Sequence, residues 1–299
     1  MERPADPMTL TLRAGSARSE IEPSRGGGLA SLEVGDRPVL SARAGRTDGS
    51  PFELAMNLLL PFSNRIAGPF AYEGQVHALP ANLEGEPFPI HGDAFQRPWD
   101  VVVATDRRVT LGLSGGLFGP YRYEASVTYG LTPGSLDTTL TLTSRSALPL
   151  PFGLGFHPWF PRSSATRVRF SATGCWPQTD RHLPATAEPV PLPPGWDFGA
   201  PAPLPPGWVN AGFSGWDGEA EIQQDDSAVP LRLSAPGLST VILYSPSAEA
   251  PFVCLEPVSH AVDAHNLPGQ PGLVRLAPGE SLSATMSLRW DDPDGPGQP

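Results

Sequence analysis

The close spacing of proline and glycine is the feature that most restricts how this chain can fold. The 299 residues include 38 Pro and 32 Gly, which is about twice the usual share for proline and somewhat high for glycine. These residues interrupt the chain about every ten positions, with no collagen-like period. Such punctuation is typical of many short strands joined by turns.

Alternation of apolar and polar residues supports the same interpretation. Four alternating segments between residues 100 and 144, separated by polar turns, predict an antiparallel meander. The best short helical candidate is residues 52–57, and residues 72–77 are expected to form a strand with a bulge at Gly74 and Gln75. We therefore expect an all-β fold, a large antiparallel β-sandwich that forms one domain over residues 1–299. The polar stretch 291–299 is expected to be a disordered tail.

The charge balance excludes several classes of function. The formal net charge is -11, and the sequence contains no lysine. Schiff-base chemistry and a P-loop lysine are therefore excluded. An acidic chain is a poor partner for nucleic acid or an anionic membrane. It also disfavours strongly anionic substrates, unless a local arginine pocket overrides the overall charge.

The chain shows no sign of export or membrane insertion. No run of ~18 apolar residues occurs, and the first residues lack the basic start and apolar core of a secretory signal. A cytoplasmic location is the default expectation. Cys175 and Cys254 do not make a disulfide framework, and their spacing matches no zinc motif.

A carboxylate ends the most apolar segment. Residues 252–257 are bounded by proline on both sides, which predicts a short strand with Glu256 on the same face as Phe252 and Cys254. Both faces are apolar as far as Glu256, so the strand is expected to be buried on both sides. Desolvation raises the pKa of such a carboxyl towards working pH, which makes a good general base. The alternative is a glutamate that points into water.

An arginine and two histidines lie in similarly unusual settings. Arg65 is flanked by apolar residues, so it is expected to bind a ligand oxygen or to form a buried ion pair that holds a loop. His91 precedes a glycine, which lets other groups approach its backbone, although a lone histidine is more commonly a hydrogen-bonded core or surface residue. His157 precedes Pro158, which places it at a strand end or edge. A histidine there can donate a proton near neutral pH.

The segment 175–208 is rich in proline and poor in pattern, and it contains the pentad Leu-Pro-Pro-Gly-Trp at 192–196 and again at 204–208. We interpret it as a long surface loop with a local duplication. Loops of this length are often functional or mobile.

Four motifs occur in one order along the chain: Asn64-Arg65-Ile66, Ile90-His91-Gly92, residues 155–160 around His157, and residues 256–266 starting at Glu256. Together they resemble the aldose 1-epimerase (galactose mutarotase) family over nearly the whole sequence. The resemblance implies a galactose mutarotase-like sandwich with a sugar site on a concave sheet. It implies that Glu256 is the base on the anomeric hydroxyl, that His157 is the acid on the ring oxygen, and that Arg65 and His91 hold the sugar.

The family usually has an aspartate where this chain has Asn210. An amide can still bond sugar hydroxyls but carries no charge, so the change alters sugar preference or weakens activity. Asp217, which follows Trp216, is a candidate substitute. The remaining substrate-binding candidates are Asn64, Trp159 and Trp216. We expect the side chains of Arg65, His91, His157 and Glu256 to meet in one cleft, lined by some of Trp99, Trp159 and Trp216.

The predicted chemistry is acid/base opening and closing of a free aldose ring, which needs no metal or other cofactor. Glu256 is expected to be ionised near neutral pH, because Arg65 or a protonated His91 offsets its desolvation. A metal cluster of Glu256, His260, Asp263 and His265 is disfavoured, because the spacing fits none of the known metal motifs.

Two alternatives remain, a hexose-6-phosphate 1-epimerase and a catalytically weak sugar-binding module. The expected partner is a small-molecule sugar, and the protein is expected to be a monomer or a homodimer.

Overall fold

The structure, a computed structural model, describes residues 9–41 and 51–292. Two large antiparallel sheets account for most of it, which confirms the predicted all-β sandwich. Helix in the described ranges is limited to short 3-10 turns: η1 (Pro51–Glu53), η2 (Ala94–Gln96) and η3 (Ala264–Asn266). No helix among the described residues is long and apolar enough to cross a membrane. Most of the predicted polar tail lies outside the described residues.

The ten-stranded sheet contains β13 and β21, which carry His157 and Glu256. Its order is β1-β2-β3-β5-β13-β21-β20-β17-β15, with β4 paired to β3. The strands are β1 (Leu10–Ala14), β2 (Ala17–Glu22), β3 (Gly28–Val34), β4 (Arg37–Leu40), β5 (Met56–Leu59), β13 (Gly155–Pro161), β15 (Gly174–Pro177), β17 (Val209–Ser214), β20 (Thr240–Ser245) and β21 (Phe252–Val258).

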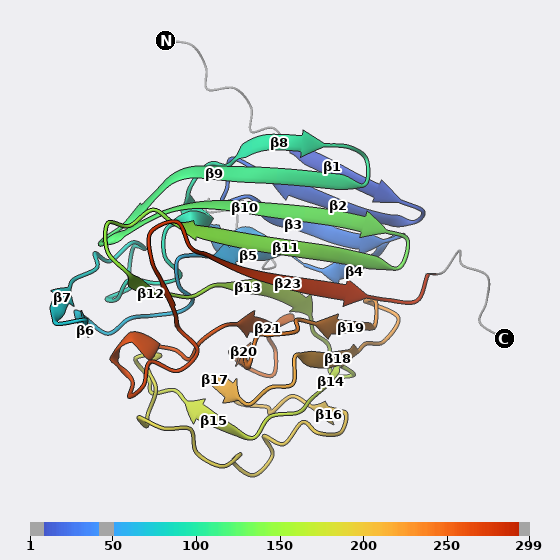
Figure 1. Cartoon of the computed structure of the whole chain (residues 1–299). Helices are drawn as coiled ribbons and strands as arrows, with labels where there is room; N and C mark the ends of the chain where they lie inside the picture. The colour runs from blue at the N-terminus through green and yellow to red at the C-terminus, as the bar shows by residue number, and fades with distance from the viewer. Residues whose placement is uncertain (1–8, 42–50, 293–299) are drawn as a thin grey trace.

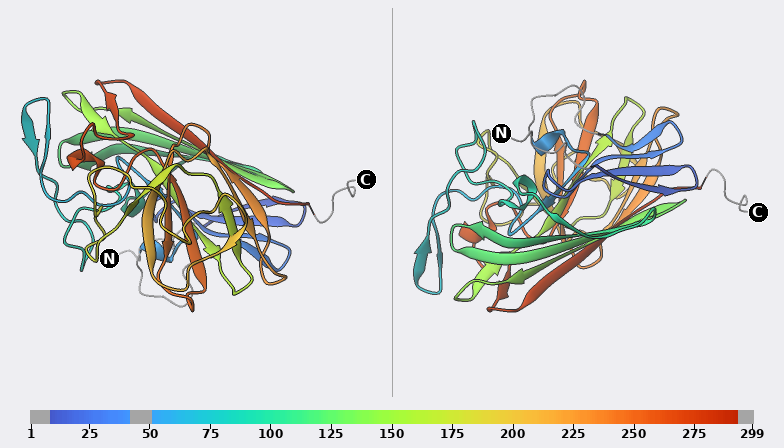
Figure 2. Two further views of the ribbon diagram at one scale, coloured as in Figure 1. Left: turned by 90° about the horizontal axis from the view of Figure 1, so that it is seen from below. Right: turned by 90° about the horizontal axis from the view of Figure 1, so that it is seen from above.

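The nine-stranded sheet forms the second layer. Its order is β16-β14-β18-β19-β23-β11-β10-β9-β8, so the predicted meander over residues 100–144 is confirmed as four neighbouring strands. The strands are β8 (Asp100–Ala104), β9 (Arg108–Phe118), β10 (Tyr121–Thr132), β11 (Ser135–Ser144), β14 (Arg167–Phe170), β16 (Ala202–Pro203), β18 (Glu219–Gln223), β19 (Leu231–Ser234) and β23 (Ser281–Arg289). Figure 1 shows the long strands of this layer lying over β1, β2 and β3, and both views in Figure 2 keep β9, β10, β11 and β23 together in one layer.

Two local predictions are wrong. Residues 52–57 do not form a helix: η1 ends at Glu53, and β5 starts at Met56 and is buried at every position. Residues 72–77 contain a hairpin turn in place of a bulge, between β6 (Phe70–Tyr72) and β7 (Gln75–His77). Glu73 and Gly74 have φ of 46° and 77°, and two successive positive values are what a tight two-residue hairpin requires. The remaining small sheet pairs β12 (Leu150–Phe152) with β22 (Val274–Leu276).

One apolar core joins the two layers. Leu29 and Phe160 from the ten-stranded sheet belong to the same buried cluster as Val127 and Met286 from the nine-stranded sheet. Because successive residues of a strand point to opposite faces, every second residue of the central strands faces this core. The other residues face outward. Nearly all of those on β13 and β21 are buried as well, whereas those of β10 are exposed or half-buried.

Candidate active site

His157 and Glu256 face each other on neighbouring strands of the ten-stranded sheet. The ladder between β13 and β21 pairs Gly155 with Val258 and Trp159 with Cys254, so the register places His157 opposite Glu256. The His157 Nε2 and Glu256 Oε1 atoms lie 3.5 Å apart, and both side chains are buried. The expected meeting of these residues is therefore found.

Proline interrupts the ladder at this point. The pairs between β13 and β21 stop at Gly155 and resume at Trp159, and the stretch between them contains Pro158 and Pro257, which have no N–H to donate. The sequence predicts that these prolines place His157 and Glu256 at strand ends. Instead both strands continue past them, and the interruption is local.

The same outward face carries polar residues from strands further along the sheet. The register pairs Cys254 with Tyr244 and Tyr244 with Asn210. Directly opposed residues share a face, so Asn210 lies on the face of Glu256, two strands away. The neighbouring row runs from Glu256 through Ile242 and Gly212 to Trp176.

His91 reaches this face from a loop. Its ring centroid lies 5.3 Å from that of His157. The backbone N–H of Asn64 donates to His91 Nδ1 over 2.9 Å, while the His91 N–H donates to the Asn64 carbonyl. Because Nδ1 accepts a hydrogen bond, the neutral ring carries its proton on Nε2. His91 therefore offers a donor, and Asn64 orients the ring.

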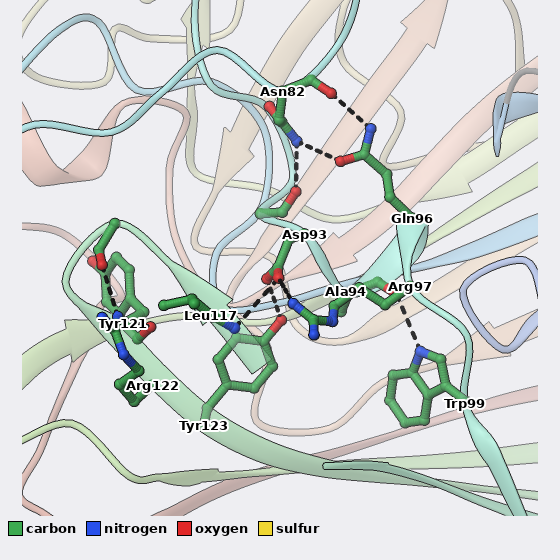
Figure 3. A network of polar contacts seen from close by, with 12 residues as sticks. Asn82, Asp93, Ala94, Gln96, Arg97, Trp99, Leu117, Tyr121, Arg122 and Tyr123 are labelled. Atoms are coloured by element: carbon green, nitrogen blue, oxygen red, sulfur yellow. Dashed lines mark hydrogen bonds and ion pairs between the residues drawn. The ribbon is translucent and has the colours of Figure 1, made fainter. Parts of the chain in front are cut away.

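A buried polar network fixes the loop that carries His91. Figure 3 shows Asp93 accepting hydrogen bonds from Tyr123 Oη at 2.5 Å, from Arg97 Nη1 at 2.9 Å and from the backbone N–H of Leu117 at 3.4 Å. On the other side of the loop, the Asn82 side-chain amide donates to the carbonyls of residues 90 and 92. The Asp93 carboxylate and the Asn82 side-chain amide therefore fix the loop that carries His91.

Arg65 is held by Glu86. The guanidinium donates from Nε to Glu86 Oε2 over 2.9 Å and from Nη2 to Oε1 over 2.6 Å, a two-pronged pair. Its Nη1 lies 3.5 Å from Asn64 Oδ1. Of the two roles expected for Arg65, ligand binding and a buried ion pair, the structure shows the ion pair. The charge of Arg65 still lowers the pKa values of His91, His157 and Glu256, so Arg65 lies close to the group.

Burial reverses the expected protonation of the pair. It raises the pKa of Glu256 to about 8, and Arg65 opposes this only in part. Burial also lowers the pKa of His157 to about 3. The pKa of His91 falls well below its ordinary value through burial and the neighbouring His157 and Arg65. Near neutral pH the His157–Glu256 pair therefore shares one proton, which resides mainly on the carboxyl, and the expectation of an ionised Glu256 is wrong.

Sequence reasoning missed residues from the long 175–208 segment. Asn210 Nδ2 lies 3.1 Å from Nδ1 of His182. Several buried polar atoms near this end of the face have no hydrogen-bond partner among the described residues. They are Asn210 Oδ1, Trp176 Nε1, and both side-chain atoms of Gln178. The length of the loop is the one feature of the sequence that indicates a functional role for this segment. Its proline-rich sequence predicts neither a strand nor the direction of any side chain.

The tryptophans divide between site and core. Trp159 stacks on His157 with centroids 4.9 Å apart and an interplanar angle of 14°. Trp99 and Trp216 belong to the inter-sheet core, where their indole N–H groups donate to Ala94 and Glu219 carbonyls. Asp217 accepts the backbone N–H of Glu219 and borders the nine-stranded sheet. The structure does not bring Trp99, Trp216 or Asp217 to the His157–Glu256 pair, so Asp217 does not supply the charge that Asn210 lacks.

One group of potential metal ligands comes together within the described ranges. Ligand atoms of His157, Cys254 and Glu256 all lie within 4.8 Å of one another and are buried. The disfavoured cluster is not assembled there. His260 bonds the Ser63 N–H and the Ser259 hydroxyl, and His265 bonds Tyr121 Oη at 2.8 Å.

Comparison with known proteins identifies the class of fold and then the family. A solved galactose mutarotase-like protein from Clostridium acetobutylicum superposes with a TM-score of 0.79 at 18% identity, over 94% of each chain. A candidate aldose 1-epimerase from Escherichia coli K12 superposes with a TM-score of 0.88 at 34% identity, over 95% of this chain and 99% of that one.

Sequence comparison agrees. The uncharacterized protein YphB of Escherichia coli K12 is 36% identical over 291 residues, 94% of this chain and 99% of its own length. The family model for aldose 1-epimerase matches residues 8–289. The chain belongs to the aldose 1-epimerase family.

Proposed function

We propose that the protein is an aldose 1-epimerase that interconverts the α and β anomers of a free aldose. The observation that carries this proposal is the buried pair of His157 and Glu256, with Nε2 and Oε1 3.5 Å apart on the outward face of the sheet. The pair lies among Arg65 and His91, which offer donors, and Trp159, which offers aromatic surface. A carboxylate and an imidazole in this relation suit a proton removed from one sugar oxygen and another delivered to its neighbour.

The reaction needs only these two groups. Glu256 removes the proton of O1 while His157 delivers a proton to O5. The C1–O5 bond breaks, its electron pair stays on O5, and C1 becomes an aldehyde. Rotation about C1–C2 turns the other face of the aldehyde towards O5, and closure returns both protons. Each positioned proton transfer contributes roughly 10²–10⁴-fold.

The pair holds the right number of protons for this cycle. One proton can sit on Glu256, which leaves His157 neutral, or on His157, which leaves Glu256 ionised. The two forms interconvert when this proton moves between the facing side chains. The reactive form is carboxylate with imidazolium, a minor form of a state that dominates near neutral pH. A sugar hydroxyl that donates to Glu256 increases the population of the carboxylate–imidazolium form, because hydrogen bonds to a carboxylate lower its pKa.

The substrate that suits the site best is an uncharged aldose. The Arg65 charge is matched by Glu86, which leaves little excess positive charge for a phosphate. The test is an anomer-exchange assay by polarimetry or NMR over free aldoses and hexose 6-phosphates. We expect exchange faster than the spontaneous rate with at least one free aldose, and a lower kcat/KM for its 6-phosphate. A preference for the phosphate would establish the hexose-6-phosphate alternative, and binding without exchange would establish a sugar-binding module.

A further inference from the structure

We propose that His182 is a specificity-determining residue of the sugar site, and that with Asn210 it recognises one hydroxyl of a neutral aldose on the ring edge away from C1. This inference rests on the proposed function. It adds a residue from the proline-rich 175–208 segment to a site otherwise built on the sheet and on the loops that carry Arg65 and His91.

The contact between the two side chains fixes what each offers to a ligand. Asn210 Nδ2 lies 3.1 Å from His182 Nδ1. With the amide in this orientation, Asn210 donates and Nδ1 accepts, so the His182 proton is on Nε2. Burial lowers the pKa of His182, which favours this neutral form. Asn210 is 5% exposed, and its Oδ1 has no hydrogen-bond partner in the described part of the chain. The pair therefore contains an acceptor without a protein partner, Asn210 Oδ1, and a donor, His182 Nε2–H.

The place of the pair on the sheet suits the far side of a sugar ring. Asn210 lies two strands from Glu256 on the same face. Asn210 shares a row with Cys254, two residues from Glu256 along β21. With neighbouring strands about 4.8 Å apart and about 3.4 Å per residue along a strand, the separation is ~12 Å. That is comparable to one pyranose ring with a hydrogen bond at each end. A sugar whose C1 and O5 lie at His157 and Glu256 therefore places a distant hydroxyl near Asn210.

The backbone holds His182 in a conformation that it would not adopt freely. Its φ is 59°, in the left-handed region that few residues other than glycine and asparagine adopt readily. Its N–H donates to the Thr179 carbonyl over 2.9 Å, and the turn is closed by Thr179 N–H donating to the Leu183 carbonyl over 2.8 Å. Strained residues that the surroundings over-determine occur often at functional sites. The ring also lies 5.8 Å from that of Trp208, which limits where it can turn.

The chemistry of the pair defines the substrate class. A hydroxyl both donates and accepts, so it matches an acceptor beside a donor. An ammonium group of an amino sugar would meet the His182 Nε2–H as donor against donor. An aspartate at 210 would accept from His182 Nδ1–H and so move the ring proton from Nε2. His182 Nε2 would then accept a hydrogen bond and no longer donate one. The site would then prefer the ammonium group of an amino sugar to a hydroxyl. His182 is therefore the reason why an amide at 210 is functional.

The first experiment measures the ring proton directly. Long-range ¹H–¹⁵N NMR resolves the tautomers of the six histidines. We expect His182 to carry its proton on Nε2 in the wild type, and to gain a proton on Nδ1 in Asn210→Asp while the other histidines are unchanged. A wild-type His182 protonated on Nδ1, or a tautomer that is the same in both proteins, would overturn the proposal.

The second experiment measures recognition. His182→Asn keeps a residue that tolerates the left-handed backbone but removes the ring, and His77→Ala on the β6–β7 hairpin is the control. On the preferred aldose we expect His182→Asn to raise KM about tenfold, the value of one neutral hydrogen bond, with kcat changed less than threefold. One monodeoxy analogue should show the same loss in the wild type and no additional loss in the variant. Amino sugars should gain in Asn210→Asp.

The outcomes separate this inference from the function on which it rests. An active wild type whose KM and deoxy-sugar profile are unchanged by His182→Asn would refute the role of His182 and leave the epimerase intact. No turnover of any aldose by the wild type would refute the proposed function. In that case, calorimetric sugar binding by wild type and His182→Asn decides the recognition role, since equal affinities would exclude it.

Discussion

Burial of the Glu256 carboxyl carries an electrostatic cost. A buried carboxylate is strongly disfavoured unless it is paired and hydrogen-bonded, and Oε2 of Glu256 has no hydrogen-bond partner among the residues the structure describes. The carboxyl meets this cost by keeping its proton, with its pKa raised to about 8. A bound sugar would supply hydrogen bonds that the apolar strand does not. The residue is therefore poised to lose its proton only when substrate is present.

The first prediction concerns removal of this group. Glu256→Gln keeps the shape and can still bond a sugar hydroxyl, but it cannot accept a proton. We expect kcat to fall by roughly 10²–10⁴, with KM changed less than threefold. Polarimetry of anomer exchange with the preferred aldose measures both constants. Glu124→Gln, an exposed residue paired with Arg145, is the control and should match the wild type. Turnover at the wild-type rate in Glu256→Gln would mean that another group is the base.

The second prediction concerns the pH dependence of kcat/KM. Activity needs exactly one proton on the pair. Because burial raises the pKa of Glu256 to about 8, we expect kcat/KM to fall above about pH 8 as the last proton leaves. Because burial lowers the pKa of His157 to about 3, we expect kcat/KM to be constant between about pH 5 and 7, with no acidic decline from the pair. Rates corrected for spontaneous exchange test this, and a decline centred near pH 6.5 on either side would contradict it.

At the scale of elements, the loop before η2 is the most constrained part of the site. His91 and Gly92 both have positive φ, 59° and 65°. A Cβ on Gly92 would lie 2.0 Å from the Leu60 carbonyl oxygen, and that atom belongs to the backbone. The loop can therefore present His91 only because the next residue has no side chain.

The third prediction follows from this contact. Gly92→Ala has to displace backbone, whereas Gly115→Ala, with φ of 68° and nothing within 4 Å, carries only the conformational penalty. We expect Gly92→Ala to lower the free energy of unfolding by about 1–3 kcal/mol more than Gly115→Ala does. It should also raise KM, because His91 moves. Urea denaturation and steady-state kinetics measure these effects, and equal stabilities of the two variants would show that the loop yields freely.

The elements also show what the sequence can and cannot predict. Alternation over residues 100–144 predicts the meander, because one face of those strands is buried and the other is not. The apolar run at 252–257 predicts a buried strand that ends in Glu256, and the resemblance of four ordered motifs to the aldose 1-epimerase family implies the roles of His157 and Glu256. The sequence does not predict that the strands continue past Pro158 and Pro257, since that depends on which ladder positions need an N–H. Contacts such as Arg65 with Glu86 and Asn210 with His182 join loops, where residue spacing carries no information on side-chain direction.

At the scale of the molecule, the buried titratable groups couple stability to pH. Burial lowers the pKa of His260 to about 4 and of His265 to about 3, and His157 behaves alike. A histidine with a lowered pKa stabilises the fold above its unfolded value of about 6.5, and this contribution is lost as pH falls towards the folded value. Glu256 acts in the opposite sense, because its contribution is present in acid and is lost as pH rises through about 8.

The fourth prediction combines these signs. The histidines outnumber Glu256, so the melting temperature should fall as pH decreases from about 6.5 to 4, and it should also fall modestly between about pH 6.5 and 8. Thermal melts followed by circular dichroism measure both limbs. Glu256→Gln should remove the alkaline decline and leave the acidic one. A melting temperature that is constant from pH 4 to 8 would show that these groups are hydrated in solution.

The alternation of β21 has a consequence for how sequence change is tolerated. Val253 and Leu255 lie in the inter-sheet core, while Cys254 and Glu256 lie on the outward face. In a saturation mutagenesis experiment scored separately for abundance and for turnover, this strand should therefore give two interleaved fitness profiles. Odd-numbered positions from 253 to 255 should lose abundance with any large change in volume, whereas position 256 should stay abundant and lose turnover. Selection for activity on new sugars can therefore change residues on the outward face of β21 without lowering the amount of folded protein.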